Sequence, residues 1–143
     1  MVLARGVRAK TDHAFHLQNF VVKVESEHVK AELAPMDIVL AKDDQDSVRL
    51  LCIENAVALA QRLGMEDSVQ LVLPTVHSFI ADKSWRVRYM VAKHYVDLAH
   101  CFGAQVLSNE LVGGFIKMLK DPEAEVKTAA ASKLTGFCSV LDL

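Results

Sequence analysis

Charged residues recur at a fixed spacing along the chain. An aspartate and a basic residue stand six positions apart three times, and successive pairs are separated by 39 residues. A carboxylate at the start of a helix is favoured by the helix dipole, and a basic group one helix later can meet the aspartate of the next unit. We therefore predict a structural ladder between adjacent units, with partner binding as the alternative role. The ladder residues are Asp43, Arg49, Asp82, Arg88, Asp121 and Lys127.

One aromatic residue interrupts the pattern. Trp85 stands where the other two copies have Asp46 and Ala124, which both suit a turn. A tryptophan there is expected near the surface, and exposed aromatic residues beside an arginine are typical anchors of protein interfaces. We predict that Trp85 binds a partner; the alternative is packing against a neighbouring turn. The predicted rim around it, for which simple solvation is the alternative, is Asp44, Gln45, Asp46, Lys83, Ser84, Arg86 and Glu123.

The sequence offers no set of residues for catalysis. Phosphate-binding glycine loops and the Gly-x-Ser-x-Gly and His-Glu-x-x-His motifs do not occur in it. His13 and His16 share a helical face but have no third metal ligand nearby. His77 takes an otherwise apolar position and is expected to be partly buried, whereas His94 is expected to be exposed. We expect no enzyme activity, no catalytic or metal-binding residue and no cofactor.

The amino-acid composition narrows the class of protein further. The 143 residues are 52% hydrophobic but only 6% aromatic, which favours close helix packing through Ala, Val, Leu and Ile. A net charge of −2 does not favour binding to nucleic acid or to an anionic membrane. The three cysteines are odd in number and widely spaced, so we expect core thiols in a reducing compartment. Arg5, Arg8 and Lys10 leave a mitochondrial presequence as an alternative interpretation of the first residues.

The 39-residue repeat extends to apolar positions. Seven of them recur at helical i, i+3, i+4 spacing in each of three predicted helices, 47–63, 86–102 and 125–141. Shorter helices are expected over 30–41, 68–80 and 107–120, with kinks at Pro35 and Pro74. The third copy of the apolar stripe reads Val126, Ala129, Ala130, Leu134, Phe137, Cys138 and Leu141.

Three features are expected to end or begin these helices. Gly64 and Gly103 follow the first two long helices, where a left-handed C-terminal residue is favoured. Asp121 and Pro122 fit an N-cap followed by the first helical position. Polar turns are expected at 42–46, 81–85 and 120–124.

The same register predicts a helix before residue 25. Leu17, Phe20, Val21 and Val24 take its apolar positions, and Lys10 takes the position of Arg49. We therefore predict an all-α superhelix of three to four antiparallel helix pairs. Its units are a partial repeat over 1–25 and repeats over 26–64, 65–103 and 104–143. Because the last stripe is fully apolar, we expect a piece of a longer array.

These motifs resemble those of a known family. The 39-residue period, the kinking proline and the Asp…Val-Arg/Lys pattern are similar to HEAT repeats. The runs Asp44–Leu51, Asp82–Ala92, Met118–Asp121 and Glu123–Val126 resemble the scaffold (A) regulatory subunit of protein phosphatase 2A. The resemblance covers about residues 25–143 and departs at 1–16 and at Asp37, where the other copies have Val76 and Phe115.

The resemblance implies a non-catalytic scaffold in the cytoplasm, with the nucleus as a further location. It implies that the turns within the repeats bind a B-type regulatory subunit. The catalytic subunit would bind only if further C-terminal repeats were supplied. Two alternatives remain: another HEAT adaptor for transport or assembly, or a remnant without a binding function.

Overall fold

The chain folds into paired helices stacked side by side. The computed structural model describes the backbone of residues 2–142 and the side chains of residues 10–142. Within that part there is no strand, and consecutive helices pack in antiparallel pairs. The predicted fold class, an all-α HEAT-type solenoid, is confirmed.

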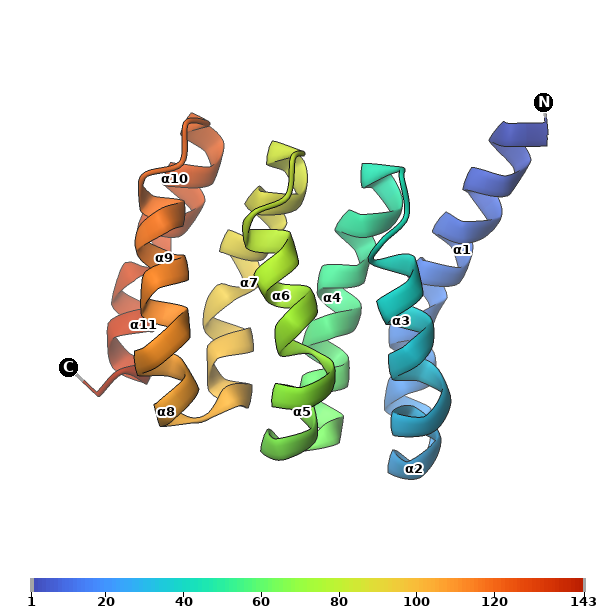
Figure 1. The fold of residues 1–143 in the computed structure, drawn as a ribbon, viewed down its shortest axis with the longest axis horizontal. Helices are drawn as coiled ribbons and strands as arrows, with labels where there is room; N and C mark the ends of the chain where they lie inside the picture. Colours follow the sequence, from blue (N-terminus) through green and yellow to red (C-terminus); the bar gives the residue numbers. More distant parts are fainter. Residues whose placement is uncertain (1, 143) are drawn as a thin grey trace.

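The helices form two layers (Figure 1). The first layer holds the long helices, which lie next to one another in chain order. The second layer holds shorter, broken helices that each contact two neighbouring long helices, and these short helices contact one another much less. The long layer is α1 (Val2–Lys23), α4 (Asp46–Leu63), α7 (Trp85–Phe102), α10 (Ala124–Ser132) and α11 (Leu134–Val140).

Each short helix is interrupted near its middle. The first and third contain a π-helical turn, and the second breaks at Val72, which lies between two α-helices. These helices are α2 (Ser26–His28), η1 (Val29–Leu33) and α3 (Ala34–Leu40); α5 (Met65–Leu71) and α6 (Leu73–Ile80); and α8 (Ala104–Val106), η2 (Leu107–Leu111) and α9 (Val112–Leu119).

Proline explains only two of these interruptions. Pro35 and Pro74 each lie in the first turn of the helical segment that follows the break, where the missing N–H is tolerated. The third break has no proline. There the Tyr95 hydroxyl donates a 2.6 Å hydrogen bond to the Leu111 carbonyl, so a long-range contact stabilises the irregular turn.

The repeated apolar positions form the core. Val48, Val87 and Val126 are each 0% exposed, and they lie at the same point of successive long helices. Residues farther along the stripe are buried as well, including Leu59 and Leu98. The fixed register thus places equivalent side chains in equivalent packing environments, as expected for a one-dimensional array.

The outermost long helices depart from the predicted stripe. The third one is broken at Lys133, and Leu134 is 46% exposed while Cys138 is only partly buried. Ser132 donates a hydrogen bond to the Ala129 carbonyl beside this break, which competes with regular helix bonding. In α1, Phe20 is 57% exposed, because α1 packs on the other described helices along one side only.

Three predicted helix ends are wrong in detail. Gly64 and Gly103 have the expected positive φ, 78° and 83°, but their ψ values of 172° and 162° are extended rather than left-handed helical. Such angles turn the chain sharply into the next helix and suit glycine. Asp121 is not the N-cap of α10, because Glu123 holds that position and Asp121 lies in the preceding turn.

Candidate functional site

A ladder of side chains runs along one edge of the array. Arg49 donates to both carboxylate oxygens of Asp82, at 2.9 Å each. Arg88 makes the same fork to Asp121, at 2.7 and 3.1 Å. Lys10 lies 2.6 Å from the carboxylate of Asp43 and takes the equivalent place for the preceding helix. Each contact joins one unit to the next, and the planar guanidinium makes two of them bidentate.

The ladder also shapes the turns within the repeats. The carboxylates of Asp43, Asp82 and Asp121 each accept a backbone N–H from the residue two positions later, at 2.8 to 3.0 Å. Arg49 donates in addition to the carbonyls of Asp43 and Asp44. One aspartate thus closes its own turn and binds the preceding repeat, so turn geometry and stacking are coupled.

The pKa values of two ladder aspartates agree with their hydrogen bonds. The hydrogen bond from Lys10 holds the pKa of Asp43 below its ordinary value. Burial works against the Arg88 hydrogen bonds at Asp121, but its pKa is lowered all the same. Lys127 is exposed and forms no ion pair with any residue between 10 and 142.

The turns lie together along the edge seen at the top of Figure 1. Among the rim residues, Ser84 donates a 2.9 Å hydrogen bond to the Asp46 carboxylate and so links two turns. Apart from this pair, no side chain of the set forms a hydrogen bond to another repeat within residues 10–142. Asp44, Gln45, Lys83 and Arg86 are exposed, whereas Asp46, Ser84 and Glu123 are partly buried.

Trp85 is the first residue of α7 and is 39% exposed. Its ring meets the ring of Tyr89 edge-on, with 6.4 Å between the centroids. The exposed side borders a hollow of about 390 Å³ that Leu50, Arg86, Met90 and Glu125 also line. Trp85 therefore packs on its own helix and still presents part of its ring beside a cavity and an arginine.

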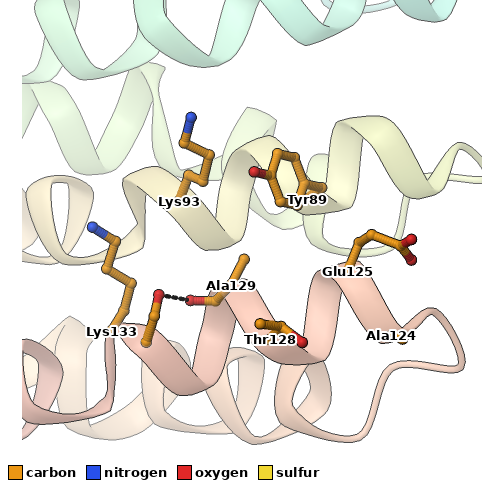
Figure 2. Close-up of a pocket in the computed structure, with 8 residues that line it drawn as sticks. Tyr89, Lys93, Ala124, Glu125, Thr128, Ala129 and Lys133 are labelled. Carbon is orange, nitrogen blue, oxygen red and sulfur yellow. Dashed lines mark hydrogen bonds between the residues drawn. The ribbon is translucent and has the colours of Figure 1, made fainter.

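A second hollow adjoins this one along the long helices. It measures about 540 Å³ and lies between α7 and α10, with Tyr89 and Glu125 shared by both hollows. Figure 2 shows Lys93 and Lys133 at one end of it and Tyr89 and Glu125 toward the other. We call this hollow the α7–α10 groove. Repeat spacing did not predict it, because a groove depends on the sizes of side chains from two different repeats.

A buried polar cluster was not predicted from the sequence either. Asp37, at 3% exposure, accepts a 3.1 Å hydrogen bond from the Asn55 amide, which donates a second one to the Ala14 carbonyl at 3.0 Å. Burial raises the pKa of Asp37 to about 7, against the hydrogen bonds from Asn55 and Cys52. This cluster joins α1, α3 and α4. The departure of Asp37 from the apolar pattern was the only signal for it.

The histidines are placed differently from expectation. His77 is exposed rather than partly buried, and its Nε2 lies 2.6 Å from the Glu110 carboxylate on the neighbouring short helix. His94 is 24% exposed rather than fully exposed, and burial lowers its pKa. Within the described residues, no three His, Cys, Asp or Glu side chains converge on a point that could hold a metal ion.

Comparisons with known proteins agree with this architecture. A family model described as the PIK3R4-like middle domain matches residues 5–141. The regulatory A-subunit of protein phosphatase PP2A from Schizosaccharomyces pombe is 39% identical over 98 residues, which is 68% of this chain and 17% of that protein. The regulatory A-subunit of protein phosphatase PP2A from Saccharomyces cerevisiae is 35% identical over 77 residues, which is 51% of this chain and 12% of that protein.

A third relative belongs to another class. The probable serine/threonine-protein kinase vps15 of Dictyostelium discoideum is 24% identical over 102 residues, 71% of this chain and 5% of that protein. The chain thus spans less than a fifth of the length of each of these relatives. None of the helices in residues 2–142 is long and apolar enough to cross a membrane. The chain belongs to the PIK3R4-like middle-domain family, and its HEAT-type repeats are those of a helical scaffold similar to the regulatory A-subunit of PP2A.

Proposed function

We propose that this chain is a non-catalytic scaffold segment of a PP2A-type phosphatase complex and docks a B-type regulatory subunit through its intra-repeat turns. The observation that carries the proposal is the turn edge itself. Arg49 and Arg88 hold consecutive turns in register through the carboxylates of the next repeat. A partner would therefore meet a rigid row of turns and lose little entropy in ordering them.

Trp85 is the proposed anchor of this interface. Its partly exposed ring stands next to Arg86 and at the mouth of the 390 Å³ hollow, so an apolar side chain from a partner could insert beside it. Tryptophan and arginine are the residues most often found to dominate binding energy. Asp44, Gln45 and Lys83 would form the solvated rim, with Asp46, Ser84 and Glu123 partly buried behind them.

The test compares binding of a purified B-type subunit to the wild-type chain and to Trp85→Ala. We expect a loss of about 2 kcal/mol, or about thirtyfold in affinity, measured by biolayer interferometry. Phe20→Ala is the matched control, because Phe20 is also an exposed aromatic residue but lies on α1 away from the turns. Equal affinity of the wild type and Trp85→Ala would refute the docking role.

A second candidate function is an adaptor in a different assembly. It is favoured by the family match, which covers nearly the whole chain, and by the resemblance to the vps15 kinase. Affinity purification of the tagged chain followed by mass spectrometry separates the two. Recovery of phosphatase subunits supports the first candidate. Recovery of kinase-complex subunits without any phosphatase subunit supports the second. For either candidate we place the chain in the cytoplasm or nucleus, where its three cysteines stay reduced.

A further inference from the structure

The α7–α10 groove is larger than the hollow beside Trp85 because three residues differ within the repeat register. Its residues Ala124, Thr128 and Ala129 take the positions that Trp85, Tyr89 and Met90 hold one repeat earlier. On α7 the larger side chains occupy more of the space next to Leu50 of α4 and leave a smaller hollow of about 390 Å³. On α10 the small ones leave about 540 Å³ open between two helices that are otherwise in close contact.

The charges of the groove also depart from the repeat. Lys93 and Lys133 line its one end, and their counterparts one repeat earlier are Glu54 and His94. Glu54 and His94 lie 3.8 Å apart, so a carboxylate and an imidazole face each other there. The equivalent pair in the groove consists of two cations.

Neither lysine of the groove is neutralised by its surroundings. The Lys93 ammonium lies 5.8 Å from the centroid of the Tyr89 ring, and no carboxylate within residues 10–142 forms an ion pair with Lys93 or Lys133. Glu125 lines the groove from the end where Tyr89 lies (Figure 2). The groove therefore has a cationic end, a floor of alanines and an aromatic ring, and an acidic residue at the opposite end.

We propose that the α7–α10 groove binds an acidic segment of a partner protein. Carboxylates of the segment would pair with Lys93 and Lys133, because ammonium–carboxylate hydrogen bonds are charge-assisted and both donors lack such a partner. An apolar side chain would fill the space above Ala124 and Ala129, beside Tyr89. A neutral or basic residue would face Glu125. This surface is the face of two long helices, so the inference goes beyond docking through the turns.

The charge pattern selects a polypeptide over a nucleic acid. A phosphate backbone would place like charge against Glu125, and the chain as a whole carries a net charge of −2. Nucleic-acid affinity depends on neutralising several phosphates in succession. Two lysines followed by a carboxylate fit a segment of mixed sequence better than a uniform polyanion.

The probe is a phage-displayed library of random peptides of about a dozen residues, selected on the immobilised chain. We expect peptides with paired Asp or Glu next to a large apolar residue. A selected peptide, labelled with fluorescein, is then titrated with protein variants by fluorescence anisotropy. Lys93→Glu should weaken binding at least about tenfold, because it places a carboxylate near Lys133, as Glu54 lies near His94. Ala129→Met should do the same by filling the groove with the side chain that Met90 supplies on α7.

The control is Lys117→Glu, an equal charge reversal at an exposed position of α9 in the other layer. It should leave peptide affinity within about twofold of the wild type, since exposed charges are screened over about 10 Å in moderate salt. Circular dichroism melting shows whether each variant folds. Because Lys93 is exposed, Lys93→Glu is expected to fold even if Ala129→Met does not, and its peptide affinity then tests the proposal alone. Selected peptides without acidic residues, no enrichment of any peptide, undiminished binding to Lys93→Glu, or displacement of the peptide by a single-stranded oligonucleotide would each overturn the proposal. The assay uses no phosphatase subunit, so its outcome is separate from that of the Trp85 experiment.

Discussion

Replacing the buried carboxyl of Asp37 by an amide should stabilise the chain in a pH-dependent way. Asp37 lies in a position that Val76 and Phe115 hold in the other repeats, and it is 3% exposed. Burial raises its pKa to about 7 from an ordinary value of 3.8. Between these two values the folded chain binds a proton that the unfolded chain has released. The contribution of Asp37 to stability is therefore greatest below about pH 4 and declines as the pH rises to about 7.

The size of the effect follows from the two pKa values. Each pH unit between them corresponds to about 1.4 kcal/mol, so the ionised carboxylate costs the fold up to about 4 kcal/mol above pH 7. Asp37→Asn has nearly the same shape and can still accept the Asn55 hydrogen bond, but it never ionises. We expect the variant to match the wild type near pH 4 and to exceed it by about 2 to 4 kcal/mol near pH 8.

The assay is urea unfolding of both proteins, followed by circular dichroism, at several pH values between about 4 and 8. Asp44→Asn serves as the control for removing one negative charge, because Asp44 is exposed on the adjacent turn. Its difference from the wild type should stay within about 0.5 kcal/mol at every pH. A stability difference for Asp37→Asn that does not change with pH would refute the reasoning, and so would destabilisation at high pH.

Two further substitutions test the ladder and the interrupted short helix. Arg49→Ala should lower the free energy of unfolding in urea by about 3 to 5 kcal/mol, because it leaves the nearly buried carboxylate of Asp82 without its ion-pair partner. Lys127→Ala is the equivalent change at an exposed position and should cost less than about 0.5 kcal/mol. Similar costs for both substitutions would contradict a stabilising ladder. Gly114→Ala should lower stability by about 1 to 3 kcal/mol, since a Cβ there would lie 2.6 Å from the Tyr95 hydroxyl and disturb its hydrogen bond to η2. Gly113→Ala has open space and should instead raise the melting temperature slightly, so a lower melting temperature for Gly113→Ala than for Gly114→Ala would show that helix propensity and sterics were weighed wrongly.

The exposure of the predicted anchor illustrates why a repeat register has limits. The register placed Trp85 at a turn, and the structure has it as the first residue of α7 with 39% of its surface exposed. Its edge-on contact with Tyr89, one helical turn later, follows from helix geometry. The hollow beside it requires Leu50 and Glu125, which come from the repeats on either side. No spacing within a single repeat could indicate that hollow.

Several properties of this protein were determined by the sequence alone, because they depend on periodicity within a helix or between repeats. The recurrence of Val48, Val87 and Val126 every 39 residues requires equivalent packing, and all three are fully buried. The helical class and the order of the helix pairs follow from the same pattern, since an apolar stripe at helical spacing can be buried only against a neighbouring helix.

Other properties were decided only by the tertiary structure, because they depend on which side chains from different repeats meet. The repeat pattern alone is compatible with an exposed side chain at Asp37. The structure places this side chain in the core, where Asn55 donates hydrogen bonds to it and to the Ala14 carbonyl. The α7–α10 groove exists because small residues of α10 face α7, and its charge is unbalanced because Lys93 and Lys133 lie together there. Periodicity specifies the direction in which a side chain points, whereas burial, hydrogen bonding and cavities depend on the shape and chemistry of the neighbour it meets.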